Sequence, residues 1–160
     1  MASNRHLGRI IALQTLYELT FRKECGDKTA DAGKITSRNI GRYKATLDDI
    51  AFIEELVKNV QKDEKSLDET IQPIAPEWPL AQIARIDHII LRMGTYELIN
   101  HDDVPPKVVI NEAVELAKAF GGDNSSKFIN GVLGTVLRQA HPKKAAELDK
   151  KAKKSKKAKA

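Results

Sequence analysis

Apolar residues recur at helical spacing along almost the whole sequence, and this feature constrains the fold more than any other. In segment 80–100 isoleucine and leucine cover much of a helix circumference, which is typical of a central, buried helix. The prolines at 105 and 106 stand where a helix would start, and Gly121 stands where it would end. No segment alternates apolar and polar residues over a useful length. The sequence therefore predicts an all-α fold of about six or seven helices joined by short loops.

The expected helices begin and end at local signals. The first should span about 5–24 and bury one apolar stripe. This stripe consists of Leu7, Ile10, Leu13, Gln14, Tyr17 and Phe21. A short helix is expected over 35–43, and residues 46–49 resemble a capping box that opens a long helix reaching residue 71. The three prolines of 73–79 interrupt the helical pattern, and Trp78 is expected to pack over this connection.

The net charge of +5 is distributed unevenly. Residues 142–160 contain nine of the 27 basic and two of the 22 acidic residues, which leaves 18 basic and 20 acidic residues in 1–141. The lysine-rich segment has almost no bulky apolar residues, so we expect one folded domain over 1–141 and a disordered tail over 142–160. Two interpretations of the tail stay open: a solubilising extension, or a non-specific clamp on polyanions.

The composition argues for a binding module rather than an enzyme. A single cysteine, Cys25, excludes an internal disulfide, and no apolar run is long enough to span a bilayer, so a soluble, cytoplasmic protein is expected. The four histidines lack metal-ligand spacing, and the serines at 125 and 126 lack a nucleophile elbow. GGDNSSK follows a predicted helix and is no phosphate-binding loop. We therefore expect no catalytic site, no metal and no cofactor.

The stretch FGGDNSSKFINGVLG, residues 120–134, combines a turn with candidate binding groups. At helical spacing Lys127 points into solvent and Phe128 lies on the shoulder of the apolar arc. Asn124 and Ser125 offer neutral donors and acceptors beside the N–H groups that begin the helix. The Phe128 ring either shields the core as a rim residue or stacks on an RNA base, a contact worth about 1–3 kcal/mol.

Two arginines of the first predicted helix, Arg5 and Arg9, are spaced i,i+4 and are expected to share a face away from the apolar stripe. Arginine can bind a phosphate through two hydrogen bonds at once. A basic helix end together with an aromatic shoulder would suit single-stranded RNA.

Three stretches resemble the NusB family of transcription antitermination factors. VPPKVVINEAVELAKAFGGDNSSKFINGVLGTVLR, residues 104–138, is similar to the C-terminal signature of the family. The pattern R-x-x-x-R-x-x-ALQTLYE, from Arg5 to Glu18, resembles its first helix, and ILRMGTYEL, residues 90–98, resembles its central helix. The resemblance implies two three-helix bundles packed as one domain. It also implies binding of the boxA element of ribosomal RNA leaders together with NusE, a small-subunit ribosomal protein, in an antitermination complex on RNA polymerase.

The resemblance also assigns residues to these partners. It implies RNA contacts by Arg5, His6, Arg9, Asn124, Lys127 and Phe128. The neighbouring Ser125 completes the candidate RNA-binding set. Tyr17 and Asp87 match positions that face NusE, although Tyr17 also lies on the predicted core stripe. His6 stands where an arginine is common in the family. Asn124 stands where many relatives have an acidic residue, and a neutral side chain there should repel phosphate less.

Two other functions were weighed against antitermination. A helical module in ribosome assembly could bind protein and contact RNA only incidentally. A NusB-like bundle also forms the leading domain of some ribosomal RNA methyltransferases, but a cofactor-binding domain would have to follow it, and here a lysine-rich segment follows instead.

Overall fold

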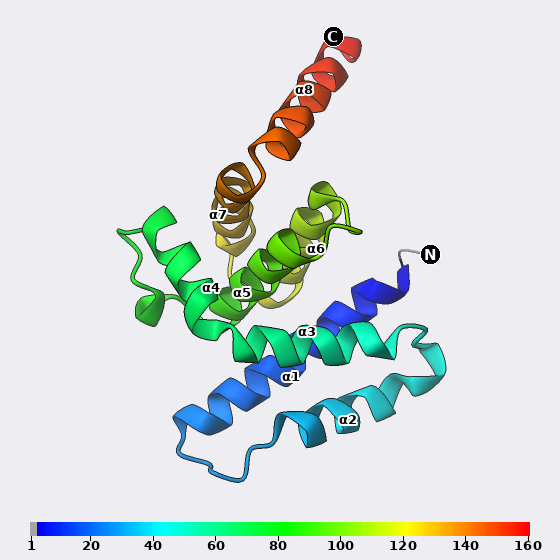
Figure 1. Ribbon diagram of the computed structural model, residues 1–160, viewed down its shortest axis with the longest axis vertical. Helices are drawn as coiled ribbons and strands as arrows, with labels where there is room; N and C mark the ends of the chain where they lie inside the picture. Colours follow the sequence, from blue (N-terminus) through cyan, green and yellow to red (C-terminus); the bar gives the residue numbers. More distant parts are fainter. Residues whose placement is uncertain (1–2) are drawn as a thin grey trace.

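The computed structural model describes residues 3–160 (Figure 1). Within this part the chain is helical and contains no strand. The α-helices are α1 (Ser3–Glu24), α2 (Ala32–Tyr43), α3 (Ile50–Lys62), α4 (Glu64–Ile71), α5 (Arg85–Asn100), α6 (Pro106–Phe120), α7 (Ser125–Ala140) and α8 (Pro142–Ala158). Three short 3-10 turns, η1 (Lys44–Thr46), η2 (Gln72–Ile74) and η3 (Leu80–Gln82), lie between them.

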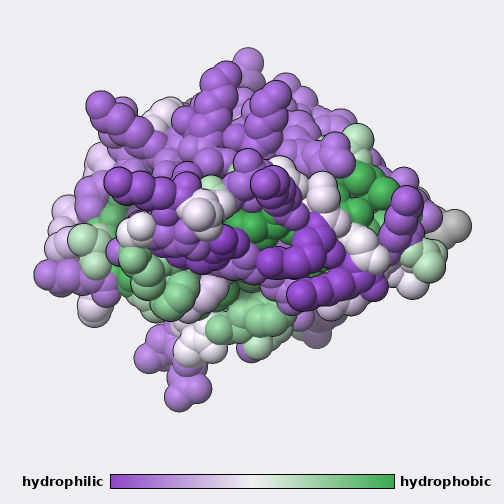
Figure 2. Space-filling view, turned by 90° about the horizontal axis from the view of Figure 1, so that it is seen from below, coloured by the Kyte–Doolittle hydropathy of each residue, from purple (hydrophilic) through white to green (hydrophobic). Residues whose placement is uncertain are grey.

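The helices form two bundles that meet along α1 and α5. Helices α1, α2 and α3 pack on one another, and α5, α6 and α7 form the second bundle, with α4 beside α5 (Figure 1). This arrangement confirms the predicted all-α fold of two three-helix bundles. Viewed from the side on which α2 lies, the surface is mainly hydrophilic, with small hydrophobic areas between the charged side chains (Figure 2).

Helix α1 buries only part of the predicted stripe: Leu13 is buried and Leu7 and Ile10 pack on the core, whereas Gln14 is exposed. Tyr17 and Phe21 were expected in the core but are exposed. The buried residues of its apolar face are Ile11, Ala12, Leu13, Leu16 and Leu19. The predicted stripe would suit a helix with a single neighbouring helix, whereas α1 packs against α2, α3 and α5. The two aromatic rings are therefore available to a partner.

The expected long helix over 46–71 is divided into α3 and α4 at Asp63. Its cap is Asp49, whose carboxylate accepts from the Phe52 N–H at 3.0 Å, rather than Thr46 as the capping box suggested. The bend turns the buried face of α4, with Leu67 and Ile71, toward the second bundle, where it packs on α5. A straight helix would carry these residues past the core.

Helix α5 is the central helix, as predicted, but it begins only at Arg85. Apart from Arg92, residues 89–98 are all buried. Gly94 allows the contact with α7, because a Cβ there would lie 2.6 Å from Leu133 Cδ1. The preceding connection does not bury Trp78, which is 59% exposed, so the expectation that this ring packs over the prolines was wrong.

Residues 142–160 differ from the disordered tail that the sequence predicted. They contain α8, which begins with Pro142 at its first position, where a missing N–H costs nothing. Ala145 is buried and Leu148 packs on the core, while every residue after Leu148 is exposed. Lysine and alanine both favour helices, and the packed first turns supply a nucleus that composition alone does not reveal.

Candidate functional site

Arg9 is the predicted RNA-binding residue whose environment differs most from expectation. It is 3% exposed, and its guanidinium donates hydrogen bonds to Glu97 at 2.9 Å (Nε–Oε2), 2.8 Å (Nη2–Oε1) and 3.2 Å (Nε–Oε1). Glu97, on α5, is also buried. The prediction that Arg9 faces solvent was therefore wrong: Arg9 ties α1 to the central helix and has no free face for a phosphate.

Arg5 and His6 remain at the surface of the α1 start. Arg5 lies 4.6 Å from the Phe52 ring centroid and contacts Asp49 at 3.2 Å and Asp103 at 3.4 Å. His6 lies 2.6 Å from Glu112 through Nδ1. Exposed ion pairs of this kind contribute little stability, so a phosphate can displace a carboxylate at small cost. The α1 start therefore presents the Arg5 guanidinium and the His6 imidazole at the surface, where an anion could contact both.

The start of α7 separates the remaining RNA candidates into exposed and buried residues. Asn124 and Lys127 are exposed and Phe128 is half-buried against the core. Ser125 is buried instead: its hydroxyl donates to Asp87 Oδ2 at 2.9 Å and accepts from the Gly122 N–H at 2.9 Å. Ser125 thus fixes the turn before α7 on α5 rather than facing a ligand.

Phe128 and Asp87 line one hollow of about 450 Å³ at the junction of η3, α5 and α7. The other side chains around it include Trp78, Ile83 and Asn124. The sequence did not indicate Trp78 as a surface residue, because a tryptophan among three prolines suggested a ring packed over the connection. The Asp87 Oδ1 atom is buried and accepts no hydrogen bond from any described residue. The hollow therefore combines two aromatic side chains with a partly desolvated carboxylate.

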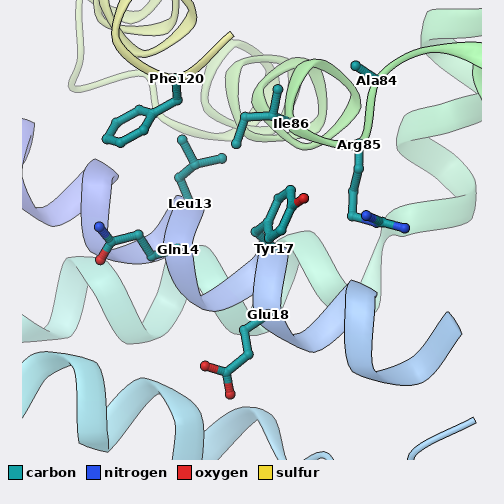
Figure 3. A pocket seen from close by; sticks show the side chains of 8 residues that line it. All are labelled: Leu13, Gln14, Tyr17, Glu18, Ala84, Arg85, Ile86 and Phe120. Atoms are coloured by element: carbon teal, nitrogen blue, oxygen red, sulfur yellow. The ribbon is translucent and has the colours of Figure 1, made fainter. Parts of the chain in front are cut away.

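A second groove, of about 470 Å³, lies between α1 and the start of α5 (Figure 3). Tyr17 rises from α1 between Ile86 and Arg85, while Phe120 closes the far end (Figure 3). The Arg85 guanidinium lies 5.5 Å from the Tyr17 ring centroid and 5.2 Å from that of Phe21, within the range of cation–π contacts. Ala84 lines both this groove and the Phe128 hollow, so the two adjoin.

Sequence reasoning found Tyr17 but missed its neighbours in the groove. Phe21 lies one helical turn after Tyr17, and Arg85 opens α5 two residues before Asp87. The i,i+4 spacing of two aromatic residues was visible, but it was interpreted as part of the core stripe. Phe120, which lines the groove, is exposed, and so is Phe21, which lies beside Arg85 outside the groove lining.

A polar network behind the α1 start joins three helices. His101 Nε2 lies 3.0 Å from Glu55 Oε2, and its Nδ1 lies 3.7 Å from Glu97 Oε1. The carboxylate of Glu97 raises the pKa of His101; partial burial opposes this shift and Glu55 adds to it. Burial and the hydrogen bond to Glu55 raise the pKa of Tyr96 to about 12. The network stabilises the position of the α1 start, and within it Arg9 and Glu97 are buried.

Within residues 3–160, no cluster of three histidine, cysteine or acidic side chains is arranged to hold a metal ion. The described helices also include none with the length and apolar character needed to cross a membrane.

Comparison with known proteins gives these surfaces a family context. The model of the NusB family matches residues 6–138. The chain belongs to the NusB family. The transcription antitermination protein NusB of Dehalococcoides mccartyi (strain CBDB1) is 42% identical over 138 residues, which cover 86% of this chain and 92% of that protein. The Staphylococcus aureus (strain JH9) protein of the same name is 42% identical over 137 residues, covering 84% and 99%.

Solved NusB structures share the fold. The chain superposes on T. maritima NusB with a TM-score of 0.77 at 28% identity, covering 89% of this chain and 96% of that one. A complex of the antitermination factors NusB and NusE with double-stranded RNA aligns with a TM-score of 0.74 at 22% identity, covering 87% and 99%. At that identity the second likeness shows the fold alone. Helix α8 begins after residue 138, beyond the NusB family match.

Proposed function

We propose that this NusB-family chain is an RNA-binding transcription antitermination factor that acts together with NusE. One observation carries the proposal. Phe128 presents a half-buried ring at the start of α7, beside exposed Asn124 and Lys127, and Lys127 pairs with no carboxylate among residues 3–160. A fixed ring supports base stacking, and an unpaired ammonium supports a phosphate contact.

The α1 start supplies a second RNA contact through Arg5 and His6. Because Arg9 is buried with Glu97, its role is to position α1 rather than to bind phosphate. Ser125 positions the Phe128 segment in the same way, through Asp87. The proposed RNA surface therefore consists of Arg5, His6, Asn124, Lys127 and Phe128.

NusE is proposed to dock in the groove between α1 and α5. Tyr17 offers a hydroxyl above an apolar floor, which is a usual composition for a protein interface anchor. Asp87 lies in the adjoining hollow, where its buried Oδ1 can accept a donor from a partner. The presence of NusE in a solved complex with a NusB protein supports this pairing, and the RNA ligand is proposed to be the boxA element. Assembly on RNA polymerase is part of the same proposal.

Replacing the Phe128 ring tests this function. We expect Phe128→Leu to weaken binding of a boxA-type RNA by roughly 5- to 150-fold, because a leucine fills the core contact but offers no ring for the ~1–3 kcal/mol stacking contact. Fluorescence anisotropy at fixed salt measures the affinity, and circular dichroism confirms that the helices persist.

Tyr43→Leu is the matched control, because Tyr43 is an exposed aromatic residue at the end of α2 and lies outside both hollows. It should leave RNA affinity unchanged. If Phe128→Leu binds boxA-type RNA as tightly as Tyr43→Leu does, the stacking surface does not exist. If NusE still binds while no RNA does, the chain is a protein-binding module with incidental RNA contact.

A further inference from the structure

Helix α8 contains the strongest unpaired charge on the molecule. Its eight lysines are Lys143, Lys144, Lys150, Lys151, Lys153, Lys154, Lys156 and Lys157. Only Lys144 forms an ion pair with another described residue, at 3.0 Å from Asp102. The other ammonium groups are free of carboxylate partners throughout residues 3–160, so their charge is directed into solvent.

Four of these lysines form a row on one side of α8. Lys150, Lys153, Lys154 and Lys157 follow i, i+3, i+4 and i+7 spacing, which places them on one face over a length of about 10 Å. The opposite face carries Ala145 and Leu148, which pack toward α7. Helix α8 therefore has an apolar face that packs toward α7 and a basic face turned away from the body.

The first turns of α8 hold this row in a defined place. His141 Nε2 lies 2.9 Å from the carbonyl oxygen of Leu98, and Ala145 is buried. Lys144 contacts Asp102, and the neighbouring Asp103 contacts Arg5 at 3.4 Å. The loop between α5 and α6 thus joins the α8 start to the proposed RNA-binding end of α1. Figure 1 shows α8 projecting from the body beyond this region.

We infer that α8 is an additional, sequence-independent RNA contact, whose lysine row binds the phosphate backbone of the strand beyond the segment held by Arg5 and Phe128. The inference rests on the proposed function. Charge is its main support: residues 1–141 contain 18 basic and 20 acidic residues, so the folded body has no net attraction for a polyanion. Residues 142–160, with nine lysines and two acidic residues, supply that attraction.

The test uses the full chain and measures how RNA affinity depends on salt. The α8 variant replaces Lys150, Lys153, Lys154 and Lys157 with glutamine, which keeps helix propensity while removing four charges. The control variant makes the same four changes at exposed body lysines, namely Lys28, Lys34, Lys58 and Lys62. The probes are a short boxA-type RNA and the same RNA extended at both ends with uridines.

We expect the α8 variant to lose roughly tenfold or more in affinity for the extended RNA at low salt. The slope of the logarithm of affinity against the logarithm of salt concentration should become shallower by about 2 to 3, because each lost phosphate contact contributes about 0.7. Affinity for the short RNA should barely change, and the control variant should follow the unmodified chain on both probes.

Three outcomes would overturn the inference. The α8 variant could keep the full salt slope on the extended RNA, or the control could lose as much as the α8 variant, which would reduce the effect to net charge. Equal weakening on the short and the extended RNA would place the lysine row on the boxA-type segment itself instead of the strand beyond it. Failure of the proposed function is distinct, because it appears as absent binding of the short RNA by the unmodified chain.

Discussion

At the scale of single residues, Arg9 is proposed to serve RNA binding by positioning α1 rather than by contacting RNA. Its guanidinium is bidentate with Glu97 and lies 5.1 Å from the Phe52 ring centroid. Arg5, one turn earlier, lies over the same ring. Arg9 therefore fixes the helix end that presents Arg5 and His6. Burial raises the pKa of Glu97, but His101 and Arg9 outweigh this effect and hold the pKa below its ordinary value.

Breaking this pair from either side should destabilise the fold. We expect Arg9→Met or Glu97→Leu alone to lower the free energy of unfolding by about 3–5 kcal/mol, because each leaves one buried charge unpaired. The double variant should recover most of this loss, since two apolar side chains replace the pair. Urea denaturation of the three variants measures the coupling. Single variants that lose less than about 1 kcal/mol would show that water reaches the pair.

The interpretation of Arg5 and Arg9 as one exposed pair could not be corrected from the sequence. Residues spaced i,i+4 share a face, but spacing does not reveal which face of α1 meets α5. Glu97 lies 88 positions further along the chain, so only the tertiary fold brings it to Arg9. The same holds for Ser125 and Asp87. Motif resemblance selected the segments of the proposed site, while burial in the structure separated the positioning residues that we propose from the exposed ones.

At the scale of helices, Asp68 adds a polar contact to the apolar packing of α4 on α5. Asp68 contacts Arg92 at 2.8 Å and His88 at 2.7 Å. Burial of Asp68 raises its pKa, but the hydrogen bonds from Arg92 and His88 outweigh burial and lower the pKa to about 2. The folded chain therefore keeps this carboxylate charged at acidities at which an unfolded chain would protonate it.

This shift predicts a pH dependence of stability. Asp68 binds a proton more weakly in the folded than in the unfolded chain, so its contribution is complete above the ordinary pKa of 3.8 and is lost as pH falls toward about 2. After allowance for solvent screening, the contribution should be about 1–2 kcal/mol.

Urea denaturation at neutral pH and at acid pH measures the contribution of Asp68 to stability. Asp68→Asn is the test variant, and Asp123→Asn, which removes an exposed carboxylate, is the control. The deficit of Asp68→Asn relative to the unmodified chain should shrink at acid pH. A loss of unfolding free energy that stays constant between neutral and acid pH would show that the charge of the Asp68 carboxylate is not its cause.

Helix positions were easier to predict than helix boundaries. Periodicity located α1, α2, α5, α6 and α7, because each buries a stripe along most of its length. It failed at Asp63, where the apolar pattern continues through a bend, and before Arg85, where η3 precedes the helix. It also failed for α8, whose helical character comes from alanine and lysine rather than from an apolar stripe. Composition predicts the absence of a core there, which is not the same as the absence of a helix.

At the scale of the whole molecule, the proposed binding surfaces lie on different parts of one body. RNA is assigned to the starts of α1 and α7, and NusE to the groove between α1 and α5 (Figure 3). The groove and the Phe128 hollow share Ala84, so a partner in the groove comes close to the RNA surface. This geometry favours cooperative binding, in which each ligand contacts the other as well as the chain.

Separate surfaces predict separable defects. We expect Tyr17→Ala and Phe120→Ala each to weaken NusE binding by roughly 30-fold, because truncating a central aromatic anchor typically costs about 2 kcal/mol. Neither change should alter the affinity for RNA alone, since both residues lie outside the RNA surface. Calorimetry with NusE, and RNA anisotropy with and without NusE, distinguish the two effects. In these variants the gain in RNA affinity on adding NusE should disappear, whereas Phe128→Leu should reduce RNA affinity under both conditions. Equal loss of RNA binding without NusE in Tyr17→Ala would instead place RNA in the groove and merge the two surfaces into one.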